Sequence, residues 1–95
     1  MLIRLVSASK FIRTAVVALG NHSENEISVP DPSVSRRHAV VVNYPDEVWL
    51  YDLGSARGTI CDGRGIAGGV FLDGVHGVSL GRAQLRISAN ARLLV

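Results

Sequence analysis

The feature that most restricts the fold of this chain is a series of short apolar stretches, each ended by glycine, proline or small polar residues. The stretches are rich in valine, leucine and isoleucine, and none continues with the 3.6-residue period of an amphipathic helix. Ten glycines and three prolines supply residues for tight turns between them. The sequence therefore predicts an all-β domain, and short strands at this spacing favour a β-sandwich or a small barrel.

One pair of stretches carries the clearest strand signal. Residues 38–44 and 47–53 are rich in β-branched or aromatic residues, and Pro45-Asp46 between them suits a type I turn, which predicts a hairpin. The remaining predicted strands cover residues 1–6, 13–19, 26–29, 59–61, 77–80 and 84–87, and residues 92–95 can pair back with the first of them.

Composition excludes several classes of protein. Hydrophobic residues make up 47% of the chain, far too many for disorder, and 95 residues suit one domain, expected to span 1–95. The longest wholly apolar run, 15–19, is far too short to cross a membrane. The single cysteine, Cys61, cannot form an internal disulfide, which favours a reducing compartment and so a cytoplasmic location. A net charge of only +2 and 5% aromatic residues argue against nucleic-acid binding.

Two loop segments carry polar residues that can bind a ligand. Residues 30–38 enter the first strand of the predicted hairpin, and residues 52–59 follow its second strand, so both lie at the same end. Together they offer the Ser35 hydroxyl, the guanidinium groups of Arg36 and Arg57, and backbone N–H groups in glycine-containing turns. Donors of these kinds suit an anion with several acceptor oxygens, above all a phosphorylated side chain.

Nothing in the pattern indicates catalysis or a cofactor. Ser35 and His38 lie three residues apart in one loop with no obvious orienting acid. One cysteine and three scattered histidines lack the spacing of metal ligands, and we expect His22 and His76 in exposed loops. We therefore predict a binding module that is not an enzyme and holds no metal.

An ordered series of short motifs resembles the forkhead-associated (FHA) domain. The series includes Leu19-Gly20, Ser35-Arg-Arg-His38, Gly58-Thr59 and Leu80-Gly81, and the likeness runs from about residue 2 to about residue 87. The resemblance implies a twisted antiparallel β-sandwich of the FHA or SMAD-like type. It also implies recognition of phosphothreonine peptides through loops at one end, here residues 20–25, 30–38 and 54–59.

The same resemblance implies roles for individual residues. Ser35 matches the serine whose hydroxyl meets the phosphate, and Arg36 matches a following position that often carries a basic or amide side chain for the same purpose. The other residues of the expected phosphopeptide site are Asn21, Ala56 and Arg57. The residues expected to shape the loops are Gly20, His38, Gly58 and Thr59.

Two departures from the family pattern leave alternatives open. Asn21 stands where the family usually has arginine, and loss of a charge-assisted hydrogen bond costs about 1.5–3 kcal/mol. Arg57 stands where the family usually has the asparagine that holds the peptide backbone. Arg57 can supply the missing positive charge, which predicts a working phosphopeptide reader. The alternative is a degenerate FHA-like domain that binds a protein partner, or a second copy of itself, without phosphate.

The structural interpretations of the same residues are simpler. Ser35 can satisfy turn backbone, and Arg37 suits a solvated basic turn. Trp49 and Tyr51 are expected to cover the sheet rather than stack on a ligand. Cys61 in a short strand is expected to be a small buried hydrophobic residue.

Overall fold

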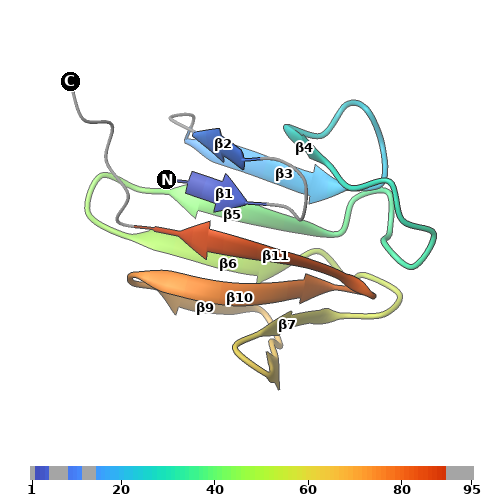
Figure 1. Ribbon diagram of the computed structural model, residues 1–95. Helices are drawn as coiled ribbons and strands as arrows, with labels where there is room; N and C mark the ends of the chain where they lie inside the picture. The colour runs from blue at the N-terminus through green and yellow to red at the C-terminus, as the bar shows by residue number, and fades with distance from the viewer. Residues whose placement is uncertain (1, 5–8, 12–14, 90–95) are drawn as a thin grey trace.

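The computed structural model describes residues 2–4, 9–11 and 15–89, and within these ranges every regular element is a β-strand. Figure 1 shows two sheets packed face to face. The six-stranded sheet contains, in spatial order, β2 (Ser9–Phe11), β1 (Leu2–Arg4), β11 (Ala83–Ser88), β10 (Val75–Leu80), β7 (Thr59–Cys61) and β8 (Arg64–Gly65). The five-stranded sheet contains β4 (Ile27–Ser28), β3 (Val16–Gly20), β5 (Ala39–Asn43), β6 (Val48–Asp52) and β9 (Gly69–Leu72).

The strand pairing confirms the predicted all-β, mainly antiparallel sandwich. Only β3 and β4, among the pairs described, run parallel. In the part of the chain that the structure describes, no helix is long and apolar enough to cross a membrane.

The predicted hairpin is present as β5 and β6. Val41 pairs with Leu50 across it, and the Tyr44 N–H donates to the Glu47 carbonyl oxygen at 2.8 Å to close the turn. The loop that enters β5 and the loop that leaves β6 therefore lie at the same end of the sandwich, which is the right-hand end in Figure 1. The turn at residues 44–47 lies at the opposite end.

Alternating side chains of both sheets fill one core. Leu19, Val41 and Leu50 of the five-stranded sheet are fully buried, as are Leu80 and Ile87 of the six-stranded sheet. Burial of each such side chain stabilises the fold by about 1.5–3 kcal/mol.

The same core extends beneath the segment between β4 and β5. Val29 and Val34 of that segment are each only 4% exposed, although neither lies in a strand. Their burial ties the loop before β5 to the interior and limits how far it can move.

Several sequence predictions need correction. Strand β9 was not predicted, because its short apolar run lies between glycine-rich turns. The strand predicted at 77–80 begins at Val75, and His76 is therefore a strand residue with a side chain 18% exposed rather than an exposed loop residue. The strand predicted at 26–29 is shortened to Ile27–Ser28 because Pro30 follows closely. The strand predicted at 92–95 lies outside the described residues.

Candidate functional site

The candidate site is built from loops at one end of the sandwich, beside the turn between β10 and β11 (Figure 1). Residues 20–25 follow β3, residues 30–38 precede β5, and residues 54–59 connect β6 to β7. The Leu53 N–H donates to the His38 carbonyl oxygen at 3.0 Å, and the Ala56 N–H donates to Ser35 Oγ at 3.1 Å. The structure thus brings together the two segments that the hairpin argument placed side by side.

Ser35 is half-buried and fixed through several atoms. Its Oγ accepts the hydrogen bond from Ala56, its N–H donates to His38 Nδ1 at 3.0 Å, and its carbonyl accepts from the Asn21 N–H at 2.9 Å. A hydroxyl that accepts one hydrogen bond still has its own hydrogen to donate. Ser35 Oγ is therefore a positioned donor at the junction of the loops.

His38 is fully buried and bridges two loops. Because a backbone N–H can only donate, the Ser35 N–H requires an unprotonated Nδ1, so the ring proton of neutral His38 lies on Nε2. That Nε2–H donates to the Gly58 carbonyl oxygen at 2.8 Å. The His38 imidazole therefore sets the separation of the loop before β5 from the loop after β6.

The loop at residues 54–59 is folded around Asp52, which sequence analysis did not select. The Asp52 carboxylate accepts hydrogen bonds from the N–H groups of Gly54 and Ser55, from Ser55 Oγ at 2.5 Å and from Thr59 Oγ1 at 2.7 Å. Burial raises the pKa of Asp52, but the hydrogen bonds from Ser55 and Thr59 outweigh it and the pKa is lowered. Gly58 has a φ of 81°, a conformation that disfavours residues with a Cβ atom. An aspartate two residues before Gly-Ser is a recognisable turn signal that could have indicated this role.

The first loop is held by two asparagine side chains. The Asn21 amide donates to the Asp31 carbonyl oxygen at 3.0 Å, so it braces the next loop. The Asn25 amide donates to the carbonyl oxygens of His22 and Arg36 at 3.0 and 2.9 Å. Asn25 is a loop-positioning residue that sequence analysis missed.

A further link joins the second loop to the turn between β10 and β11. Asp31 Oδ1 accepts from the N–H and Oγ of Ser33 at 2.8 and 2.6 Å, and Ser33 Oγ accepts from the Arg82 N–H at 2.7 Å. The hydrogen bonds from the Ser33 hydroxyl and N–H lower the pKa of Asp31. Ser33 is 4% exposed, so this link is part of the packed interior.

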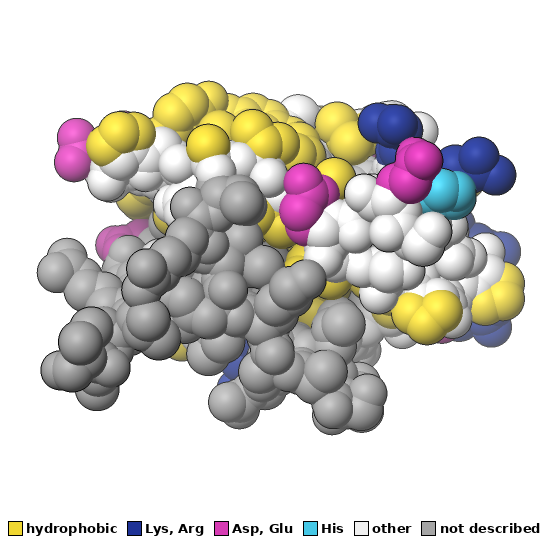
Figure 2. Space-filling view, turned by 90° about the horizontal axis from the view of Figure 1, so that it is seen from above, with side chains coloured by type: hydrophobic (Ala, Val, Ile, Leu, Met, Phe, Trp, Pro, Cys, Tyr) yellow, Lys and Arg dark blue, Asp and Glu magenta, His cyan; other side chains and the backbone are white. Residues whose placement is uncertain are grey.

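The side chains of Arg36, Arg37 and Arg57 are exposed at this end. Among the residues that the structure describes, none of the three forms an ion pair with an acidic side chain. Figure 2 shows basic side chains gathered toward the same end. The site therefore combines fixed neutral donors with unpaired positive charge, an arrangement suited to an anion.

The chain belongs to the FHA-domain family, because the family model matches residues 17–87. Solved FHA structures share its fold. The FHA domain of CT664 from Chlamydia trachomatis is 27% identical with a TM-score of 0.83, and the match covers 88% of this chain and 91% of that domain. The FhaA FHA domain, solved with the intracellular domain of Rv3910, is 22% identical with a TM-score of 0.82, covering 88% of this chain and 94% of that one.

A larger protein contains a similar domain. EmbR from Mycobacterium tuberculosis, solved with a low-affinity phosphopeptide, is 23% identical with a TM-score of 0.82, and the match covers 96% of this chain but 26% of EmbR. No curated protein matches the chain.

Proposed function

We propose that this domain binds phosphothreonine-containing segments of a protein partner through residues 20–25, 30–38 and 54–59, without catalysing a reaction. The observation that carries the proposal is the position of Ser35 Oγ, which accepts a hydrogen bond from the Ala56 N–H at 3.1 Å where the two loops meet. Arg36, next to Ser35, and Arg57, next to Ala56, are both exposed. A phosphorylated side chain brings about −1.5 to −2 charges and three acceptor oxygens, which can use these donors together. A signalling or scaffolding role in the cytoplasm follows as part of this proposal.

The rigidity of the loops supports affinity. Donors that are already positioned lose less conformational entropy on binding than donors that must be ordered by the ligand. The Asn21 amide is occupied by the Asp31 carbonyl oxygen, so it supports the loop instead of supplying charge. In this proposal Arg57 provides the positive charge that the family usually places at position 21.

Replacing Ser35 with alanine is expected to weaken binding of a degenerate phosphothreonine peptide pool about tenfold, because a hydrogen bond to a charged acceptor is lost. Isothermal titration measures this, with Ser88→Ala at the far end of β11 as the matched serine control. Arg57→Ala is expected to cause a similar loss, while Arg86→Ala in the middle of β11 leaves affinity unchanged. Equal affinity of the wild type and Ser35→Ala would contradict the proposed site.

A second candidate function is self-association without phosphate, which is favoured by the outer face of the five-stranded sheet. Non-charged, mainly apolar residues occupy the outward positions of its strands β3, β5, β6 and β9, and cross-strand pairing aligns them in two adjacent rows. The first row contains Val16, Val42, Trp49 and Phe71, and the second contains Ala18, Val40, Tyr51 and Gly69. Trp49 stacks on Tyr51 with ring centroids 6.2 Å apart. Figure 2 shows hydrophobic side chains along this side of the molecule. We call these two rows the outer apolar face.

A second copy of the chain is the partner that the charges around this face favour. Arg36 and Arg37 precede β5, and Asp46 and Glu47 follow its other end. Two copies stacked face to face with their β5 strands antiparallel would bring the arginines of each copy near the acidic residues of the other.

Sedimentation velocity tests this second candidate. Phe71 is 45% exposed on the outer apolar face, and Phe71→Glu is expected to convert a dimer to a monomer because a buried unpaired carboxylate opposes association. Ile60→Glu is the matched control, because Ile60 is 39% exposed in the other sheet. A wild-type chain that stays monomeric at high concentration would rule the dimer out.

A further inference from the structure

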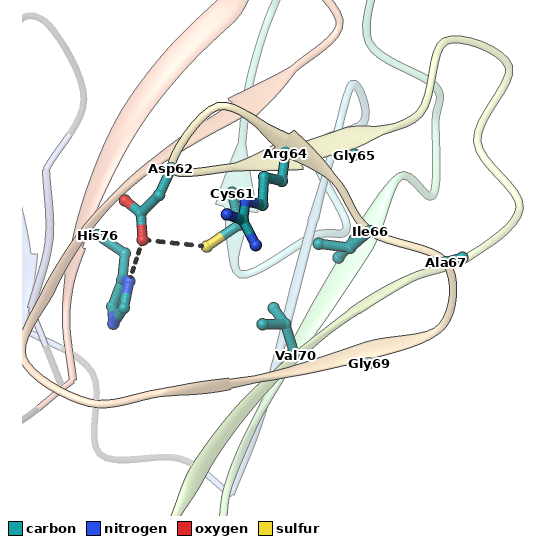
Figure 3. A pocket seen from close by; sticks show the side chains of 9 residues that line it. All are labelled: Cys61, Asp62, Arg64, Gly65, Ile66, Ala67, Gly69, Val70 and His76. Atoms are coloured by element: carbon teal, nitrogen blue, oxygen red, sulfur yellow. Dashed lines mark hydrogen bonds and ion pairs between the residues drawn. The ribbon is translucent and has the colours of Figure 1, made fainter.

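A second cluster of chemically active side chains lies away from the recognition loops. Cys61 ends β7, Asp62 begins the turn to β8, and His76 lies in β10. Their ligand atoms, the thiol sulfur, a carboxylate oxygen and an imidazole nitrogen, all lie within 4.8 Å of one another. Figure 3 shows the three side chains converging at the mouth of a pocket that Ile66 and Val70 also line.

The strand pattern places these side chains at the rim between the two sheets. In β10, His76 occupies the same face as Val78 and Leu80, which are core residues. In β7, Cys61 occupies the same buried face as Thr59. Cysteine and histidine thus stand at inward-facing positions, where the rest of the sandwich mostly has aliphatic residues.

The backbone at Asp62 brings its carboxylate onto the same side as the thiol. Adjacent side chains of an extended strand point to opposite faces. Asp62 instead has a φ of 51°, and it is the only non-glycine residue in the described ranges with a positive φ. The turn therefore directs Asp62 toward Cys61 and His76, and this conformation is less favourable than an extended one for a residue with a Cβ atom.

Neighbouring groups orient both the carboxylate and the imidazole. Asp62 Oδ1 accepts from the Gly77 N–H at 3.0 Å, which leaves Oδ2 facing His76 Nδ1 at 2.5 Å. On the far side of the ring, Nε2 lies 3.0 Å from both the N–H and the carbonyl oxygen of Asp73. It accepts from that N–H when Nδ1 carries the ring proton, and it can donate to the carbonyl oxygen when Nδ1 is free to bind an ion. Histidine ligands of metal ions commonly donate their second N–H to such a carbonyl, which fixes the ring with its other nitrogen toward the ion.

We propose that Cys61 Sγ, Asp62 Oδ2 and His76 Nδ1 bind a zinc ion, with water completing a tetrahedral site. Zinc accepts sulfur, nitrogen and oxygen ligands together at about 2.0–2.3 Å, whereas calcium and magnesium require oxygen ligands. Tetrahedral geometry with these bond lengths separates ligand atoms by roughly 3.3–3.7 Å. The Asp62 carboxylate and His76 ring therefore move apart by about 1 Å to admit the ion, and the thiol sulfur moves inward.

The charges around the cluster also fit a divalent cation. The Asp62 carboxylate supplies one negative charge, and the Cys61 thiol supplies a second once it loses its proton. Binding of the ion would displace the Cys61 thiol proton and any proton on His76 Nδ1 to solvent. Arg64 lines the same pocket and opposes a cation, but the thiolate and carboxylate together outweigh its single charge.

The bound ion would join the turn after β7 to β10. Asp62 lies in that turn, and the Asp62 N–H already donates to the Gly77 carbonyl oxygen at 2.8 Å. A zinc ion would add coordinate bonds to this contact near the edge of the six-stranded sheet, where β8 is the one described strand beyond β7. Zinc should therefore raise the melting temperature of the domain, because it binds the folded chain preferentially.

Cobalt titration of the full chain, reduced with a phosphine instead of a thiol, tests the proposal. We expect one equivalent of Co²⁺ to produce thiolate-to-cobalt charge-transfer absorption that Zn²⁺ abolishes by displacement. Cys61→Ala should lose this absorption, and His76→Gln should weaken binding at least about tenfold. His22→Gln, which alters a histidine outside the cluster, should bind as the wild type does.

A second measurement keeps the test decisive if Cys61→Ala does not fold. The melting temperature should rise with Zn²⁺ for the wild type and His22→Gln but not for His76→Gln, and Mg²⁺ should have no effect on any of them. The proposal is overturned if the folded wild type gives no cobalt absorption in metal excess. It is overturned equally if absorption and thermal shift survive His76→Gln unchanged.

Discussion

Replacing His38 with alanine is expected to lower the free energy of unfolding by about 3 kcal/mol, the largest stability effect of any single change in the site. The imidazole is fully buried, so its removal leaves a cavity. It also leaves the Ser35 N–H and the Gly58 carbonyl oxygen without their partners inside the protein. Urea unfolding followed by Trp49 fluorescence measures the change.

A conservative variant separates hydrogen bonding from packing at this position. His38→Asn keeps an oxygen that can accept from the Ser35 N–H but cannot reach Gly58, so it should recover about 1 kcal/mol of the loss. His22→Ala should cost well under about 1 kcal/mol because His22 lies in a surface loop. A His38→Ala variant as stable as the wild type would show that the bridge between the loops is unimportant.

Gly20→Ala is expected to destabilise the domain by about 2–3 kcal/mol and to abolish most phosphopeptide binding. A Cβ atom at Gly20 would lie 2.0 Å from the Arg36 carbonyl oxygen, which is backbone and cannot rotate away. The loop that carries Ser35 and Arg36 must therefore move. This displacement should lower affinity at least about tenfold, because the phosphate donors lose their relative positions.

Gly77→Ala is the matched control for this substitution. A Cβ atom at Gly77 meets nothing within 4 Å, so alanine should change neither stability nor affinity appreciably. Thermal unfolding and peptide titration on the same samples distinguish the two variants. Similar effects from both substitutions would mean that close packing of Gly20 on Arg36 does not define the loop.

Much of the fold could be predicted from local sequence patterns. Alternating β-branched residues and Pro45-Asp46 indicated the β5–β6 hairpin, and the hairpin alone implied that the loops carrying Ser35 and Arg57 are neighbours. That inference needed no long-range information, because a two-residue turn fixes which strand ends meet. The ordered FHA motifs then implied that the predicted strands form a twisted antiparallel β-sandwich.

The features that sequence analysis missed depend on contacts between distant residues. Asn25 reaches the Arg36 carbonyl oxygen eleven positions away, and Ser33 reaches Arg82 from another turn of the fold. His76 looked like a loop residue because Gly74 and Gly77 flank it, yet pairing with β11 extends β10 through this region. Periodicity cannot show such pairing, since the partner strand supplies the hydrogen bonds.

The measurement that tests the central claim most directly is an amide NMR titration of the domain with a degenerate phosphothreonine peptide pool and with the same pool after dephosphorylation. We predict that only the phosphorylated pool shifts the amide signals of Ser35, Arg36, Ala56 and Arg57, while Ser88 at the far end stays unchanged. No shifts in these loops from the phosphorylated pool, or equal shifts from both pools, would contradict phosphothreonine recognition at this site.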